Sequence, residues 1–173
     1  MTDNNAAQAS KKRDLVVTRT FDAPVELVWK AWTDPEHVRQ WWGPDHFTSP
    51  CAKMDFRVGG TSLVCMRAPK EFGGQDMYST WAYKKIVPMQ QIEFIQNLAD
   101  KDGNLVDPVE MGLPAEFPKD VRTVVTFKAV ADNETEMTVT QYGMPAADMQ
   151  LGKNAELGLN QSLDKMAASF ARV

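Results

Sequence analysis

Towards the end of the chain, apolar residues recur every three or four positions, which is the spacing of one face of an α-helix. Within residues 152–173 these positions are Leu159, Leu163, Met166 and Phe170, with Ala155 and Ala167 beside them. The spacing predicts a long amphipathic helix with a broad apolar face. Such a face must be covered by another part of the protein.

Most of the chain before this helix shows a different pattern, in which apolar and polar residues alternate as in half-buried β-strands. We predict strands at residues 15–21, 47–58, 61–68, 77–87, 91–98, 121–130 and 135–142. A run of strands followed by one long helix is typical of an α+β fold with an antiparallel sheet. The sheet must curve around the final helix to cover its apolar face.

Two short helices are predicted after the first strand. Asp22 is expected to cap the first helix, residues 25–32, with a proline in its first turn. The Thr-Asp-Pro sequence at residues 33–35 ends that helix and begins a second, residues 36–42, which Gly43-Pro44 stops.

Residues 100–120 interrupt this regular pattern. The segment contains three prolines and two glycines, so we predict that it is irregular. Connections of this length in a compact domain are often lids or binding loops. A surface excursion without a role is the alternative.

Composition and charge narrow the class of protein. The 173 residues are 43% hydrophobic and 24% charged, which is ordinary for one soluble domain. We expect residues 1–13 to form a disordered tail and residues 14–173 to form a single domain. A net charge of -4 argues against nucleic acid as a partner. No apolar run reaches the ~20 residues of a membrane span, and the N-terminus lacks a signal-peptide core, so we expect a cytoplasmic protein without a membrane partner.

The sequence contains no familiar catalytic or metal-binding motif. His37 and His46 are the only histidines, and neither belongs to a set with the spacing of zinc ligands. We therefore expect no metal, no cofactor and no catalytic residue, although Asp45 beside His46 would suit an acid–base pair at a cavity mouth. His37 lies among charged residues and is expected to be exposed. Cys51 and Cys65 are expected to be small buried side chains rather than a disulfide.

Five segments carry a resemblance to a known superfamily. They are R-T-F-D-A-P-V-E-L-V-W-K-A-W-T-D-P-E-H-V-R-Q-W-W-G-P at residues 19–44, V-G-G-T at 58–61, Y-K-K-I-V-P at 83–88, T-V-V-T-F at 123–127 with M-T-V-T-Q at 137–141, and G-L-N-Q-S-L-D-K-M at 158–166. In this order they resemble the START-like helix-grip (SRPBCC) superfamily. Within it, the chain is similar to the bacterial branch related to the activator of the ninety-kDa heat-shock-protein ATPase. Leu159 departs from the pattern, because many relatives have Trp after the glycine.

The resemblance implies a seven-stranded antiparallel sheet curved around the C-terminal helix, with the two short helices closing one end. It also implies a hydrophobic cavity between the helix and the sheet. Members of the superfamily bind lipids, sterols, polyketides and plant hormones, and some are enzymes. Such a likeness predicts architecture better than function.

We predict that side chains on the inner faces of the sheet and the helix contact a ligand. The residues chosen are Trp41, Trp42, Phe47, Met54, Met66, Met77, Trp81, Tyr83, Phe94, Gln96, Gln141, Leu159, Leu163 and Met166. Aromatic rings stack on flat molecules, and methionine side chains adapt to irregular ones. The two glutamines lie on otherwise apolar faces, where an unpaired amide costs ~1–3 kcal/mol, so each needs a partner. Ordinary core packing is the alternative for the aromatic residues and methionines.

The sequence thus favours a small soluble protein, monomer or homodimer, that binds an apolar or aromatic small molecule or a lipid. Two alternatives use other properties of the same fold. A cyclase- or hydratase-type enzyme would need an ionisable side chain in the cavity. A co-chaperone-like partner protein would need an exposed apolar patch.

Overall fold

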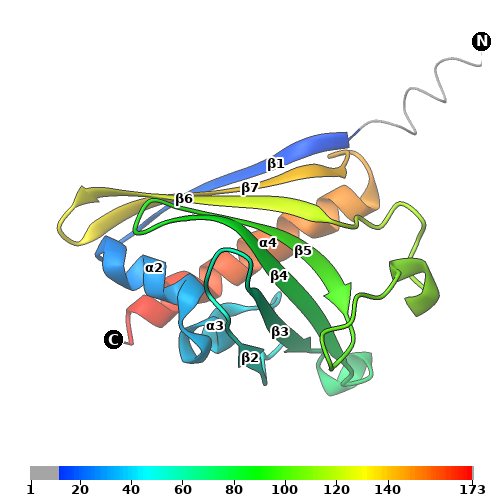
Figure 1. Cartoon of the computed structure of the whole chain (residues 1–173). Helices are drawn as coiled ribbons and strands as arrows, with labels where there is room; N and C mark the ends of the chain where they lie inside the picture. Colours follow the sequence, from blue (N-terminus) through cyan, green and yellow to red (C-terminus); the bar gives the residue numbers. More distant parts are fainter. Residues whose placement is uncertain (1–11, 173) are drawn as a thin grey trace, which may run out of the picture.

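Figure 1 shows an antiparallel sheet that curves around one long helix, in a computed structural model that describes residues 12–172. The seven strands follow the order β1-β7-β6-β5-β4-β3-β2. They are β1 (Lys12–Phe21), β2 (Ala52–Lys53), β3 (Thr61–Arg67), β4 (Asp76–Val87), β5 (Gln91–Ala99), β6 (Val121–Ala131) and β7 (Glu134–Pro145). The helices are α2 (Val25–Thr33), α3 (Pro35–Trp41) and α4 (Gln150–Phe170), with short 3₁₀ helices η1 (Lys70–Phe72) and η2 (Pro108–Met111). The predicted α+β helix-grip fold is confirmed.

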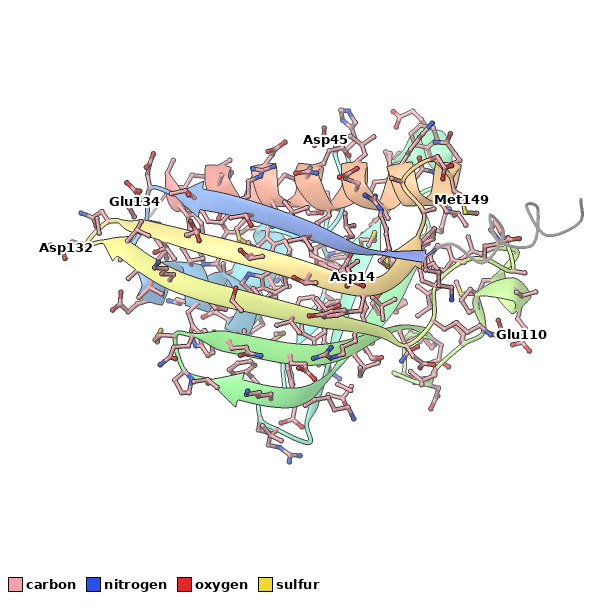
Figure 2. All side chains as sticks on the ribbon, turned by 90° about the horizontal axis from the view of Figure 1, so that it is seen from above. Asp14, Asp45, Glu110, Asp132, Glu134 and Met149 are labelled. Carbon is pink, nitrogen blue, oxygen red and sulfur yellow. The ribbon has the colours of Figure 1, made fainter. Side chains whose placement is uncertain are left out.

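The groove between the sheet and α4 has two ends that are built from different segments. Helices α2 and α3 cover the concave face near the C-terminal end of α4, whereas residues 100–120 lie at the other end, beside the start of α4 (Figure 1). Seen from above, Glu110 of η2 and Met149 before α4 lie at one end of the molecule, and Asp132 and Glu134 at the other (Figure 2). We call these the loop end and the α2–α3 end.

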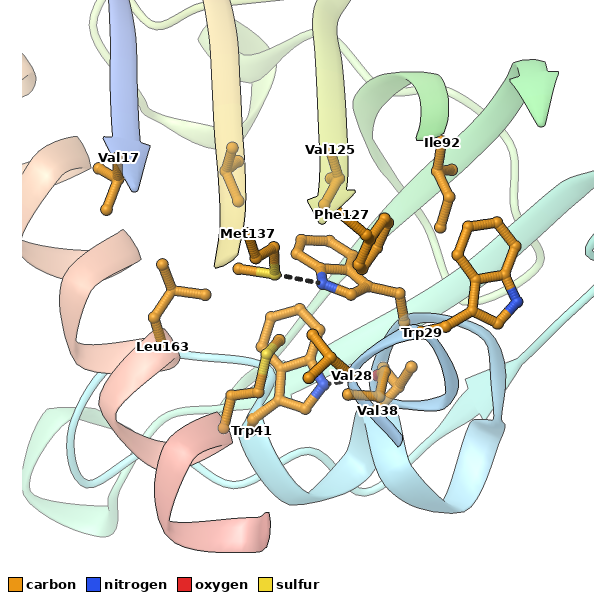
Figure 3. Packing of buried hydrophobic residues seen from close by; sticks show 14 of the residues in the cluster. Val17, Val28, Trp29, Val38, Trp41, Ile92, Val125, Phe127, Met137 and Leu163 are labelled. Carbon is orange, nitrogen blue, oxygen red and sulfur yellow. Dashed lines mark hydrogen bonds between the residues drawn. The ribbon is translucent and has the colours of Figure 1, made fainter. Parts of the chain in front are cut away.

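The α2–α3 end is filled by an aromatic cluster of Trp32, Trp41, Trp81 and Phe94. The ring centroids of Trp32 and Trp41 are 4.7 Å apart, and those of Trp81 and Phe94 are 5.0 Å apart. The Trp32 indole N–H donates to the Met137 sulfur at 3.2 Å. Figure 3 shows Trp41, Met137 and Leu163 meeting between the sheet and α4. These contacts attach both short helices and α4 to the same core.

The strand expected between α3 and β3 is mostly absent. We predicted a strand over residues 47–58, but within that range only Ala52–Lys53 forms a strand, and Thr48 makes an isolated bridge to Arg67. Past it, hydrogen bonds between nearby residues replace strand pairing, including Gly60 N–H to Arg57 O at 2.8 Å. Gly60 makes this turn possible, because a Cβ there would overlap the Asp55 carbonyl.

The helix boundaries differ from the prediction at two places. Asp22 does not cap α2; Pro24 is the N-cap and supplies no side-chain bond. Asp34 caps α3 instead, accepting from Glu36 N–H at 2.9 Å and His37 N–H at 3.3 Å. Within α4 the expected apolar face is largely buried, but Ala167 is exposed.

The first residues of the described chain belong to the sheet. Lys12 and Arg13, which we expected in the tail, begin β1 and pair with Pro145 and Met144 of β7. The rest of the expected tail, residues 1–11, lies outside the described residues, as does residue 173. Between residues 12 and 172 no helix combines the length and the apolarity needed to cross a membrane.

Helix α4 is held along β1 by two arginines and at its start by close packing. Arg13 Nη2 donates to the Gly152 carbonyl at 3.3 Å, and Arg19 Nη2 lies 2.8 Å from an Asp164 carboxylate oxygen. Gly152 is pressed against the Ala146 carbonyl, so a Cβ at this position would overlap it. The start of α4 therefore has one fixed position against the chain that leaves β7.

We predict that Gly152→Ala destabilises the protein and that Gly158→Ala does not. The added methyl group at 152 collides with backbone, and overpacking of this kind typically costs about 1–3 kcal/mol. Nothing lies within 4 Å of a Cβ at Gly158, so alanine there should raise the free energy of unfolding by up to about 1 kcal/mol through helix propensity. Urea denaturation of both variants measures the difference, and equal effects would contradict the proposed contact.

We also predict different costs for Trp41→Phe and Trp81→Phe, although both rings are fully buried. Trp41 Nε1 donates to the Ala31 carbonyl at 2.7 Å. Four residues after Ala31 stands Pro35, which has no N–H to give that carbonyl. Trp81 Nε1 has no acceptor among residues 12–172. Trp41→Phe should therefore cost about 1–3 kcal/mol more than Trp81→Phe in the free energy of unfolding. A larger loss for Trp81→Phe in urea denaturation would contradict this.

Candidate functional site

A cavity of about 400 Å³ lies at the loop end of the groove, partly open to solvent. Its walls come from the inner face of the sheet, from the first turns of α4 and from the 100–120 segment. It adjoins the aromatic cluster along the strands. On β4, Ser79 lines the cavity and Trp81 is core; on β5, Gln96 lines the cavity and Phe94 is core. Alternate residues of a strand share a face, so the two residues of each pair are neighbours on the inner face of the sheet. The boundary between cavity and core therefore separates small or flexible side chains from large rings.

The sheet contributes most of the lining. Met66 of β3 pairs with Met77 of β4, and both reach the cavity. Val121 of β6 pairs with Gln96 of β5, and Gln141 extends the surface onto β7. The surface is therefore mainly thioether and aliphatic, with a glutamine on each side of β6.

Helix α4 and the loop close the cavity from the other sides. Leu151 and Ala155 are four residues apart on α4, which places them on one helix face. Leu113 and Phe117 come from the 100–120 segment. That segment is tied down at its end, where Asp120 N–H donates to Asn97 Oδ1 at 2.8 Å. The segment thus forms part of the cavity wall.

The structure separates the predicted site residues into several groups. Four line the cavity: Met66, Met77, Gln96 and Gln141. Six are almost completely buried in the core: Trp41, Trp81, Tyr83, Phe94, Leu163 and Met166. Three are partly buried and pack against that core: Trp42, Met54 and Leu159. Phe47 lies in the loop after α3, where its carbonyl accepts from Lys165 Nζ at 3.2 Å. The core residues lie outside the lining because their neighbouring rings fill the space that a ligand would need.

Sequence reasoning missed the contributions of Leu113, Phe117, Leu151 and Ala155. The apolar pair in the proline-rich segment was the available signal for the loop. Ala155 was recognised as part of the helix face, but its small size, which leaves space beside it, was not used.

The side-chain amides of Gln96 and Gln141 form no hydrogen bond with any residue between 12 and 172, and both side chains are half-buried. Other amides at the cavity are engaged. Asn97 holds Asp120, and Asn154 Oδ1 accepts from Gln150 Nε2 at 2.8 Å. The two glutamines therefore retain donors and acceptors at the cavity surface.

Within residues 12–172, none of the side chains that line the cavity is ionisable. Tyr83 lies deeper in the core, with its hydroxyl 2.7 Å from Ser62 Oγ, and burial raises the pKa of Tyr83 to about 12. Asp45 and His46 are both exposed, and His46 borders a separate shallow hollow beside Phe72. The acid–base arrangement considered from the sequence is therefore not assembled at this cavity.

Other polar groups of interest also lie outside the cavity lining. His37 was expected to be exposed, but it is buried, with Nε2 3.0 Å from Ser169 Oγ; burial lowers its pKa. Cys51 and Cys65 are free thiols, and burial raises the pKa of Cys65 to about 12. Across residues 12–172, no three His, Cys, Asp or Glu side chains are grouped to hold a metal ion.

Comparison with known proteins places the chain in a family. Residues 22–171 match the family described as activator of Hsp90 ATPase homolog 1-like protein. No curated protein matches the chain.

Several solved structures share its fold. A Chromobacterium violaceum protein is 26% identical, with a TM-score of 0.71, and the match covers 91% of this chain and 96% of that one. An Arthrobacter aurescens protein is 24% identical, with a TM-score of 0.75 and coverage of 94% and 88%. The AHSA1 protein of Silicibacter pomeroyi is 20% identical, with a TM-score of 0.69 and coverage of 91% and 97%.

The resemblance inferred from the five sequence segments is confirmed by these matches and by the sheet that curves around α4. The family match begins just after β1 and continues to the end of α4. The chain belongs to the family of activator of Hsp90 ATPase homolog 1-like proteins, a branch of the START-like helix-grip (SRPBCC) superfamily.

Proposed function

We propose that this protein binds an apolar small molecule in the cavity at the loop end of the groove. The observation that carries the proposal is the composition of the lining, in which Met66, Met77, Leu113 and Phe117 surround two unpaired glutamine amides. A volume of about 400 Å³ falls within the roughly 300–1,000 Å³ of pockets for drug-sized ligands. Mostly apolar walls with a few polar groups are typical of such pockets.

Binding is better supported than acid–base catalysis. A general acid or base must lie within hydrogen-bond reach of the reacting group. Tyr83 and His37, which have shifted pKa values, are core residues outside the lining. The polar side chains that line the cavity within residues 12–172 are amides and a serine hydroxyl, and neither group ionises near neutral pH.

A role as a protein partner, which the family name suggests, has less support here. Such a role favours a contiguous exposed apolar patch. Exposed apolar side chains include Val16 on β1, Phe72 on η1 and Leu157 on α4, which belong to separate elements. Leu105, Val109 and Met111 are exposed together in the 100–120 segment, but three side chains make a small patch.

We predict that Ala155→Phe weakens binding of the neutral dye Nile red at least tenfold, because the ring would occupy space in the cavity. Ala168→Phe is the matched control, since Ala168 is exposed on the same helix and receives the same substitution. Fluorescence titration measures both affinities, and thermal denaturation checks that both variants remain folded. Equal Nile red affinities in the two variants would argue against binding in this cavity. Native mass spectrometry of freshly purified protein should in addition reveal any retained molecule.

A further inference from the structure

We propose that the natural occupant of this cavity is an electrically neutral molecule whose carbonyl, amide or hydroxyl groups are bound by Gln96 and Gln141. The inference rests on the proposed function and specifies the chemical class of the ligand. It follows from two properties of the lining, the lack of charge and the placement of the two amides.

A charged ligand would lose hydration in this cavity without gaining a counterion. The lining residues within the described part of the chain are apolar, amide or hydroxyl side chains. Transfer of an unpaired carboxylate or ammonium group into such surroundings is strongly unfavourable, whereas a neutral polar group needs only a hydrogen bond. The lining therefore selects against ligand charge of either sign.

The charged groups in the neighbourhood lie outside the cavity lining. Arg13 pairs with Met144 in the β1–β7 register; its Nη2 donates to the Gly152 carbonyl and lies 3.5 Å from Glu156, while its buried Nε has no partner within residues 12–172. Lys12, Glu116 and Lys119 line a second hollow. The residues that this hollow shares with the cavity, Phe117, Pro118 and Pro145, are uncharged.

Backbone carbonyls flank the start of α4. Helix N-termini bind anions through free backbone N–H groups. Here the carbonyl oxygens of Pro145 and Ala146 pack against Gly152 in the first turn. The Ala146 carbonyl also accepts from the N–H of Met149, the N-cap residue, at 3.0 Å. These carbonyl dipoles lower the positive potential of the turn, so it attracts an anion less strongly than an open helix N-terminus would.

The two glutamines are placed to bind separate polar groups of one ligand. Gln96 pairs with Val121 across β5 and β6, and Gln141 pairs with Thr123 across β6 and β7. They therefore lie on the two strands that flank β6, two strand spacings or roughly 10 Å apart across the sheet, and are offset by two residues along it. Each amide offers a carbonyl acceptor and an N–H donor, so it accepts carbonyl, amide and hydroxyl partners alike.

The apolar body of the ligand would lie between these amides and the opposite wall. Val121 lies on the strand between the glutamines, and Met77 and Met66 lie beyond Gln96, on β4 and β3. Leu113 and Phe117 face the cavity from the loop. Flexible thioethers adapt to an irregular body, so the glutamines supply orientation while the methionines supply contact area.

A competition experiment tests the proposal with molecules that differ only in the head group. Nile red bound to the full-length protein is displaced at pH 7.5 by decan-1-ol, decanamide, decanoate or decylammonium, all below their aggregation concentrations. The alcohol and the amide are expected to displace the dye at concentrations at least tenfold lower than the two ions. Because the single head group of decanamide can pair with only one of the two separated glutamines at a time, at least one of Gln96→Leu and Gln141→Leu should raise the decanamide concentration needed by about three- to tenfold. Gln90→Leu, at an exposed turn position, should leave it unchanged.

A variant with reversed selectivity gives a second measurement. Gln141→Lys places a cation in the lining and should improve displacement by decanoate relative to decanamide. Displacement by decanoate or decylammonium equal to that by the neutral pair in the unmodified protein would overturn the proposal, as would unchanged decanamide competition in both leucine variants. If Nile red binds and responds to Ala155→Phe but no decyl compound competes, this inference fails while the proposed function stands. If Nile red does not bind, both fail.

Discussion

Packing of aromatic rings between the sheet and α4 is the interaction on which the rest of this structure depends. The aromatic cluster joins α2, α3, β4 and β5, and Met137 of β7 accepts a hydrogen bond from Trp32. Trp41 also supplies the donor that the Ala31 carbonyl lacks because of Pro35. The α2–α3 end of the groove is consequently solid, and α4 has a fixed position relative to the strands.

The same constraint explains why space remains at the loop end. Once α4 is fixed at one end, its distance from the sheet at the other end is set by backbone contacts, chiefly Gly152 against Ala146. The side chains there are too small to fill that distance, as Ser79 and Ala155 illustrate. The cavity is the result of a rigid frame combined with small residues, and the 100–120 segment covers part of it with Leu113 and Phe117.

These relations determine what the sequence could predict. Periodicity and family resemblance were sufficient for the strand and helix order, because long alternating segments have few alternatives. They failed for residues 54–58, where turn hydrogen bonds replaced a strand, and for His37, whose buried ring is bonded to Ser169 far along the chain. For the site, large aromatic residues such as Trp81 were natural candidates from the sequence. A ring fills space as well as binding ligands, however, and only the three-dimensional arrangement shows which groove positions remain open. The glutamines were identified because an unpaired amide on an apolar face is unusual in either setting.

The boundary between Ser79 and Trp81 on a single strand has an evolutionary consequence. Most of the packing energy comes from the aromatic side of this boundary. Substitutions on the cavity side can therefore alter the recognised molecule with little loss of folding stability. Neighbouring members of a lineage could then diverge in specificity through a few changes in Met66, Met77, Gln96 or Gln141. A fold with this division is well suited to acquiring new binding partners by gradual mutation.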